Sequence, residues 1–158
     1  MPDAAGFEAF YREHLARIVR ACALVTLDRS VAEDVAAEAF TRLWAAWGQI
    51  RSSDHAGGYV FKTAMRLCAR EAARRRRPVA PAAPSDDLER SIARSHVVSA
   101  LGRLPIRQRQ AVVLRDWAGF ETSEVARLLG LRESTVRVHL ARARERLRTD
   151  LLVEDREP

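Results

Sequence analysis

The stretch LGLRESTVRVHLARARERLR, residues 129–148, decides the fold of the second half of the chain. It carries six arginines against two glutamates. Ala126, just before it, and Gly130 and Val136 within it are separated by four and six residues. A close crossing of two helices needs a small residue, a left-handed turn and a buried aliphatic side chain at such offsets. The stretch therefore predicts a helix-turn-helix, with a short helix over about 120–129 and a long basic helix over about 132–150.

The segments around this motif are also predicted to be helical. LERSIARSHVVSALGRL (88–104) forms a lead-in helix, and Pro105 suits the start of the next one, IRQRQAVVLRDWAG. Before them lies PVAPAAPSDD (78–87), where three prolines in seven residues exclude both helix and central strand. This segment is predicted to be an extended linker, and no alternating β-type run of useful length lies on either side of it.

The first part of the chain, about residues 4–77, parses into three helices. Apolar residues recur at three- and four-residue steps in FEAFYREHLARIVRACALVTLD, VAEDVAAEAFTRLWAAWGQI and YVFKTAMRLCAREAARRRR. Either Asp28 or Ser30 can cap the second helix, with Glu33 as a capping-box partner of Ser30. Trp44 is assigned to the apolar stripe of the second helix and Tyr59 to that of the third. The predicted fold class is all-α, with helical domains at 4–77 and 88–152 joined by the linker 78–87.

Charge and cysteine usage limit the function. The net charge of +6 and the pI near 10.5 favour a polyanionic partner, nucleic acid first. The chain lacks an apolar run of the roughly 18–20 residues that a membrane span needs, and its acidic N-terminus lacks an apolar signal core, so we expect a cytoplasmic protein. Cys22 and Cys68 stand apart without a CxxC or a Cys/His cluster, which predicts two reduced, buried thiols and no metal site.

Catalysis is not expected. The histidines are scattered, and no Gly-rich loop resembles a P-loop. The histidines are His14, His55, His96 and His139. The sequence therefore predicts neither an enzyme nor a cofactor.

Three sets of side chains are candidates for binding. In a helix-turn-helix, the first turn of the second helix approaches the base edges of DNA. The arginines of this helix could instead form only a solvated face, but they are more numerous than solubility requires. The candidate DNA contacts of this helix are Arg132, Glu133, Ser134, Thr135, Arg137, His139 and Arg142. The third helix offers a basic stripe that can bind phosphate, or is merely a solvated helix end: Lys62, Arg66, Arg70, Arg74 and Arg75. Glu33, Asp34 and Glu38 would repel phosphate, so their face should meet solvent or a protein partner.

These pieces together resemble an extracytoplasmic-function (ECF) sigma factor of bacterial RNA polymerase, a sigma-70 type subunit with regions 2 and 4 only. VAEDVAAEAFTRLW is similar to the family's AED-x-x-x-E-x-F-x-x-x-W segment in region 2. LPIRQRQAVVLRDWAGFETSEVARLLGLRESTVRVHLARARERLR resembles region 4 from its LP-x-R-x-R start to its end. The resemblance covers nearly the whole chain, in the family's order and with a Pro-rich linker between the halves.

The resemblance implies a division of labour. Glu33, Asp34 and Glu38 would dock on the β′ clamp helices of polymerase, with the β flap as a further contact. Residues 51–58 and the basic helix after them would engage the −10 element, where a base flips into a protein pocket. The helix-turn-helix would bind the −35 element as duplex. Any anti-sigma factor would be a separate chain.

The sequence departs from the family pattern at a few positions. Ala37 stands where glutamine is common, Met65, Arg66 and Arg70 replace the usual Arg-Asn and Asp positions, and Val138-His139 replaces a common Ser-Arg pair. Base preferences are therefore not transferable at these positions.

Two other functions compete with promoter specificity. One is a free-standing, LuxR-like helix-turn-helix regulator with an N-terminal helical domain, which would have no use for the acidic helix. The other is a sigma-like protein that binds polymerase without initiating.

Overall fold

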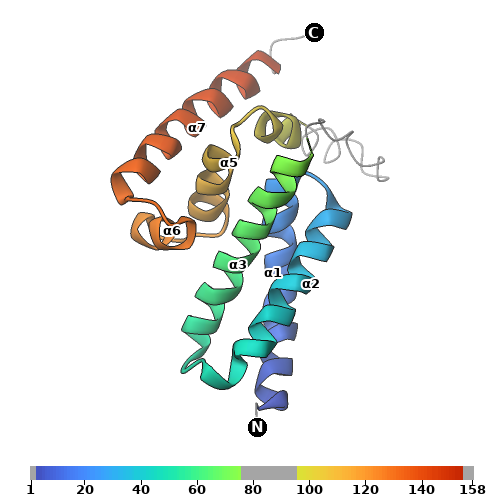
Figure 1. The fold of residues 1–158 in the computed structure, drawn as a ribbon. Helices are drawn as coiled ribbons and strands as arrows, with labels where there is room; N and C mark the ends of the chain where they lie inside the picture. The colour runs from blue at the N-terminus through green and yellow to red at the C-terminus, as the bar shows by residue number, and fades with distance from the viewer. Residues whose placement is uncertain (1–2, 76–95, 155–158) are drawn as a thin grey trace.

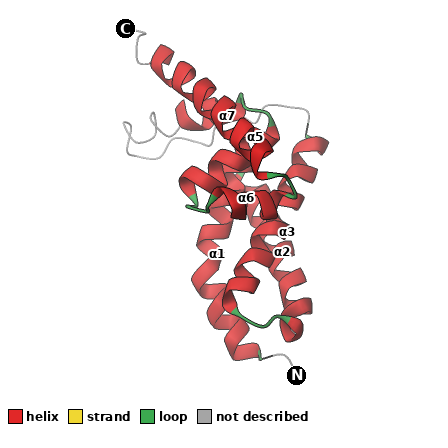
Figure 2. Ribbon diagram, turned by 90° about the vertical axis from the view of Figure 1, so that its left-hand side faces the viewer, coloured by secondary structure: helices red, strands yellow, loops and turns green. Residues whose placement is uncertain are grey.

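The computed structural model describes residues 3–75 and 96–154, and Figure 1 shows two groups of helices within these ranges. The first group contains α1 (Ala4–Thr26), α2 (Arg29–Ala46), a short 3-10 turn (Trp47–Gln49) and α3 (Ser53–Arg74). The second contains a helical stretch over 96–102, α5 (Ile106–Val112), a π-helical turn (Val113–Trp117), α6 (Thr122–Leu129) and α7 (Glu133–Glu154). Helices and loops account for all of these residues (Figure 2), which confirms the all-α prediction. The predicted linker 78–87 and the start of the predicted helix 88–104 lie outside the described residues.

The first group is a three-helix bundle whose core follows the predicted apolar stripes. Small side chains let α1, α2 and α3 approach closely, and the fully buried positions alternate between aliphatic residues, alanine and cysteine. Cys22 of α1 and Cys68 of α3 are both buried and free, as predicted. Contact with Cys22 and burial both raise the pKa of the Cys68 thiol, so it stays protonated. No helix in the described part of the chain has the length and apolar character that a bilayer crossing requires.

Asp28 caps α2. Its backbone is extended, and its Oδ1 accepts a hydrogen bond of 3.1 Å from the Val31 amide. Its other oxygen accepts one of 2.7 Å from Arg75, which follows α3. The alternative with Ser30 as cap is wrong, because Ser30 lies inside the helix and Glu33 instead pairs with Arg29.

We expect Asp28→Ala to destabilise the fold by about 1 kcal/mol at neutral pH, the usual cost of losing a cap. The Val31 amide, and then Arg75, lower the pKa of Asp28 from its ordinary 3.8, so the folded state favours the carboxylate. Its contribution is therefore complete well above pH 3.8 and is lost as the pH falls through the lowered folded pKa.

Urea unfolding of both proteins at neutral pH and at successively lower pH would measure this effect. The difference in unfolding free energy between wild type and Asp28→Ala should narrow on acidification. Asp28→Asn is the control, since it keeps the cap and loses only the charge. A difference that grows as the pH falls would contradict the role of the carboxylate.

Two aromatic residues lie at the edges of their apolar stripes rather than inside the core. Trp44 is 39% exposed, although its ring packs edge-on against Phe7 at 4.9 Å between centroids. Tyr59 is 37% exposed and lies beside the turn between α2 and α3. The prediction that both rings belong to the apolar faces of their helices is therefore only half right, because no other helix of the described residues covers those edges.

The two groups of helices share one continuous core, with α6 packed against α3 (Figure 1). The rings of Phe61 on α3 and Phe120 before α6 meet edge to face at 4.9 Å between centroids. The guanidinium of Arg17 on α1 lies over both rings, 5.3 Å and 5.4 Å from their centroids, and donates to the Ala118 carbonyl. A charge placed over two packed rings gives the contact a defined geometry as well as buried area.

Polar contacts from α5 strengthen this contact. Gln110 is fully buried, and its Nε2 donates to the Met65 carbonyl of α3 at 2.8 Å. Arg109 donates to the Val25 carbonyl at the end of α1 at 2.7 Å. Buried donors in these positions would be costly without their acceptors, so these hydrogen bonds favour this docked arrangement of the two groups over others.

Candidate nucleic-acid and polymerase surfaces

The turn between α6 and α7 has the geometry of a helix-turn-helix. Gly130 adopts a left-handed φ of 65°, which glycine tolerates without strain, and the Leu131 amide donates back to the Ala126 carbonyl at 2.9 Å. Ala126 is nearly buried and Val136 fully so, as the spacing predicts. A capping box stabilises the N-terminal end of α6, the first helix of the motif; in it the Glu121 amide donates to the Glu124 carboxylate at 2.8 Å. The second helix is thus held rigidly on the first.

Most of the predicted duplex contacts on α7 are exposed. Thr135 and His139 differ, since both are partly buried at the edge of the helix that faces α5 and α6, and His139 Nδ1 is buried without a hydrogen-bond partner in the described residues. The exposed members of the set are Arg132, Glu133, Ser134, Arg137 and Arg142. Figure 1 shows α7 on the side of its group that faces away from α1–α3, so its outer face is open.

Two arginines of α7 have carboxylate partners. Arg137 pairs with Glu133 one turn earlier at 2.9 Å. Arg144 makes two hydrogen bonds to Asp116, which lies in the π-helical turn, and the Asp116 carboxylate raises the pKa of Arg144. This pair ties α7 to the turn before α6. The sequence did not predict this pair, because Asp116 lies 28 residues before Arg144 in a π-helical turn that no local pattern indicates.

The basic stripe on α3 is present for most of its predicted length. Lys62, Arg66 and Arg70 are exposed at four-residue steps, about 6 Å apart along the helix axis. Arg74 is exposed and lies 3.5 Å from Glu71. Arg75 is placed differently, because its guanidinium binds Asp28 at the start of α2. Lys62, Arg66 and Arg70, which have no ion pair among the residues that the structure describes, therefore make up the stripe.

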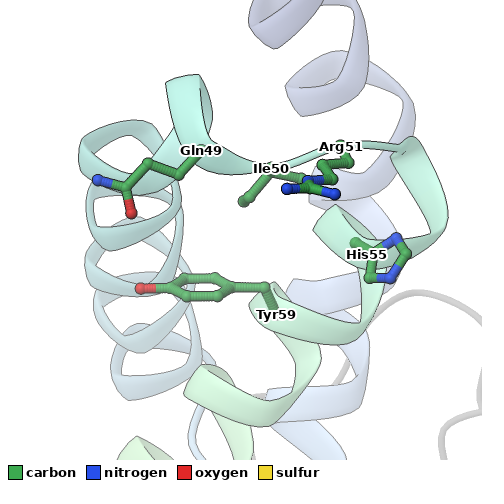
Figure 3. Close-up of a pocket in the computed structure, with 5 residues that line it drawn as sticks. All are labelled: Gln49, Ile50, Arg51, His55 and Tyr59. Atoms are coloured by element: carbon green, nitrogen blue, oxygen red, sulfur yellow. The ribbon is translucent and has the colours of Figure 1, made fainter.

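A hollow of about 330 Å³ lies where α2 turns into α3 (Figure 3). Its lining residues are Gln49, Ile50, Arg51, His55 and Tyr59. Ser52 caps α3 through the His55 amide, and its hydroxyl also contacts the His55 ring at 2.5 Å, which holds that ring beside the hollow. Figure 3 shows the Tyr59 ring along one side and Arg51 on the other. The sequence indicated the loop but not Gln49, Ile50 or Tyr59.

The acidic residues form one exposed face of α2. Glu33 pairs with Arg29 at 3.1 Å and Glu38 with Arg42 at 2.5 Å. Asp34, near the middle of the face, has no ion pair among the described residues. The exposed edge of Trp44 lies beside the same face, giving it an apolar element next to the acids. In those residues no group of three potential ligands is placed to hold a metal ion.

Comparison with known proteins explains this combination of surfaces. Residues 10–78 match the family described as Sigma-70 region 2, and residues 96–147 match Sigma-70, region 4. The ECF RNA polymerase sigma factor SigM of Mycobacterium tuberculosis is 30% identical over 155 residues, covering 92% of this chain and 76% of its own. The chain belongs to the ECF sigma factor family. Members of this family are initiation factors that direct RNA polymerase to promoters, and they are not enzymes.

Other relatives agree with this ECF sigma factor in sequence and fold. The RNA polymerase sigma-E factor of Streptomyces coelicolor is 29% identical, with 98% of this chain and 91% of that one covered. The solved structure of CnrH in complex with the cytosolic domain of CnrY superposes with a TM-score of 0.75 at 22% identity, covering 98% of this chain and 92% of that one. The sigma factor RpoE in complex with the anti-sigma factor NepR from Bartonella quintana gives 0.74 at 21%, covering 94% and 98%. These two structures support the fold.

The structure accounts for one departure of this sigma factor from the family pattern. Met65 is only 1% exposed, and its carbonyl accepts the hydrogen bond from Gln110. Its side chain belongs to the core, whereas the neighbouring Arg66 is exposed. The departure at position 65 is therefore one of packing.

Proposed function

We propose that this chain is the promoter-specificity subunit of an RNA polymerase holoenzyme, acting in the cytoplasm, where that enzyme works. The α1–α3 group, with Lys62, Arg66 and Arg70, binds the −10 element, and α7 binds the −35 element. The acidic face of α2 docks on the β′ clamp helices, while the α5–α7 group also contacts the β flap. The chain itself performs no catalysis and needs no cofactor.

The separation of charge between faces carries this proposal. In a chain with a net charge of +6, exposed cations without an ion pair in the described residues line α3 and α7, among them Lys62, Arg66 and Arg142. Glu33, Asp34 and Glu38 gather instead on α2 beside Trp44, where Arg29 and Arg42 pair with only two of the three acids. A surface that binds phosphate cannot include this face, so the face suits a basic protein partner. A free-standing regulator, the alternative function, has no use for such a face.

The hollow beside α3 suits an unstacked base of the −10 element. Tyr59 and Ile50 offer an aromatic face and an apolar side chain, and Arg51 a cation for the adjoining phosphate. Extracting a base from the stack costs a few kcal/mol, which stacking and phosphate contacts offset. This makes the hollow the site where the opened strand is held.

The docked arrangement must open for both elements to be bound. Elements centred at −10 and −35 lie about 85 Å apart along duplex DNA at 3.4 Å per base pair. At about 1.5 Å per residue, the 23 residues of α1 and the 22 of α7 are about 35 Å and 33 Å long, so even end to end these two helices fall short of that distance. Residues 76–95 join the two groups, and a chain of that length can reach at most about 70 Å. Residues 76–95 are therefore long enough to let the two groups of helices move apart, and the interface between α3 and α6 opposes this movement.

A transcription assay with purified chain, polymerase core and a library of promoters tests the proposal. We expect run-off transcripts from a subset of promoters, and only when the chain is present. Tight sequence-specific DNA binding without polymerase, together with no transcript, would instead support the LuxR-like regulator. Binding to core without a transcript from any promoter would support a sigma-like protein that titrates polymerase. The relatives solved with anti-sigma factors make a separate inhibitory chain a reasonable further partner.

Charge reversal should separate the two binding functions. We expect Asp34→Arg to weaken binding to polymerase core by about tenfold or more, since like charges across an interface cost several kcal/mol, while DNA binding by α7 is retained. Arg137→Glu should weaken binding to the upstream element and leave core binding intact. Core binding is measured by fluorescence anisotropy and promoter binding with the holoenzyme.

Exposed residues of α1 provide matched controls. Glu13→Arg and Arg20→Glu change the charge by the same amount at positions to which no contact with polymerase or DNA is assigned, and both should behave as wild type. Equal losses in both assays for either test variant would refute the division of labour.

A further inference from the structure

The outward face of α7 is defined by the residues that point the other way. Val136, Leu140 and Ala143 are buried against α5 and α6. At 100° per residue, the positions opposite them are Ser134, Val138, Ala141 and Glu145. Val138 stands at the centre of this outward face, and it is 47% exposed.

Arginines border this face on both sides. Arg137 and Arg148 lie along one edge and Arg142 and Arg146 along the other, all exposed. Of these, only Arg137 has a carboxylate partner among the described residues. The uncharged strip from Ser134 through Val138 to Ala141, which ends at the exposed Glu145, is thus flanked by two rows of cations. The major groove, about 12 Å wide, presents base edges at its floor and phosphates along both rims, which is the complementary arrangement.

Val138 is not among the side chains that form or pack on the described core, and a β-branched side chain is among the weaker helix formers. The small side chains of Ser134 and Ala141 on either side let the backbone approach the groove closely. The only apolar group that base edges present in the major groove is the C5-methyl of thymine.

We propose that Val138 is a specificity-determining residue of the upstream element, which selects thymine at one position through its C5-methyl group. This role rests on the proposed binding of α7 to duplex promoter DNA. The arginine rows hold the phosphates and set the register, and Val138 then discriminates one pyrimidine from the other. Cytosine lacks the methyl group, and the Val138 side chain has no acceptor for a hydrogen bond from the cytosine amino group.

Replacement of thymine by deoxyuridine tests this role, because it removes the methyl group and nothing else. The probe is an upstream element selected from a randomised promoter library by the holoenzyme that contains the full chain. Each thymine in that element, on both strands, is replaced in turn. We expect wild type to bind about fourfold more weakly at one position, the factor that burial of one methyl group gives. Val138→Ala should bind the thymine promoter about fourfold more weakly and show no further loss with deoxyuridine.

Val153→Ala is the matched control. Val153 is an exposed valine near the far end of the same helix, and its variant should keep the full deoxyuridine penalty. Both substitutions are on the surface, so thermal unfolding should be nearly unchanged.

Two results would overturn the role of Val138: a selected element in which no deoxyuridine substitution weakens binding, or a Val138→Ala variant that keeps the penalty. In both cases the holoenzyme still selects an upstream element, so the proposed function stands. A holoenzyme that selects no upstream element at all would remove the proposed function and this role with it.

Discussion

Covalent joining of the two helix groups across their interface should abolish transcription from promoters that need both elements. Leu27, after α1, and Gly102, at the end of the helical stretch 96–102, provide the position. A Cβ added at Gly102 would lie 3.2 Å from the Leu27 Cδ1, so the side chains at these two positions are neighbours and thiols there lie within reach of a short thiol-reactive linker. Leu27→Cys also removes the methyl group that a side chain at 102 would meet. The joined chain is held in the docked arrangement, which is too short to span about 85 Å of duplex.

The residual transcription should equal the fraction of molecules that are not cross-linked, because only in those molecules can the two groups of helices separate. A short thiol-reactive linker, or oxidation to a disulfide, would be applied before polymerase is added, and the joined fraction read from a denaturing gel. Reduction of the disulfide should restore transcription. Since α7 faces away from the interface, the joined chain should keep its affinity for an isolated upstream duplex, which separates a failure to open from a failure to fold.

Controls follow from the cysteines already present. Cys22 and Cys68 are completely buried and should resist the reagent, so each single variant, Leu27→Cys or Gly102→Cys, should stay fully active after the same treatment. A completely joined chain that supports wild-type run-off would show that both elements can be contacted without opening.

The helices and the helix-turn-helix were predictable because their signals are local. Apolar spacing determines which face of a helix is buried, and Gly130 marks the turn through a backbone conformation that other residues resist. The prediction was weaker at stripe edges. Trp44 and Tyr59 have the same spacing as core residues, and whether a neighbouring helix covers them depends on packing that no local pattern records.

The docking of the two groups could not be predicted from the sequence. Arg17, Phe61 and Phe120 come from three distant segments, and each alone resembles an ordinary surface or core residue. The candidate binding surfaces were partly predictable, since acids and arginines cluster by helix face. Their pairing was not, because the contact between Asp116 and Arg144 depends on a π-helical turn.

Arg109 is the clearest case of a motif residue whose role only the structure gives. It is the second arginine of the LP-x-R-x-R segment. Its Nε donates to the Leu101 carbonyl at 2.8 Å, and its terminal nitrogens donate to those of Leu104, Gly102 and Val25 at 3.0, 3.3 and 2.7 Å. These acceptors include the last carbonyls of two helices, where a cation is favoured. Burial lowers the pKa of Arg109, but an arginine remains charged.

We expect Arg109→Met to destabilise the fold by about 3 kcal/mol, because it leaves partly buried carbonyls without a charged donor. For a chain of this size the melting temperature should fall by roughly 6–12 °C. Arg109→Lys should recover only part of this loss. A guanidinium presents several donors in a planar fork, whereas the compact ammonium of lysine cannot reach all of these acceptors at once. Differential scanning calorimetry measures all three proteins.

Arg107→Met is the matched control from the same segment. Arg107 is exposed and donates at 3.3 Å to Gln110 and 3.5 Å to the Leu129 carbonyl, both long contacts, so its loss should cost under about 1 kcal/mol. Because the Val25 carbonyl belongs to α1, Arg109→Met should also loosen the docking of the two groups, seen as faster amide exchange at the end of α1. Equal destabilisation by the two methionine variants would contradict the role of Arg109. A stability loss without faster exchange in α1 would confine that role to the α5–α7 group.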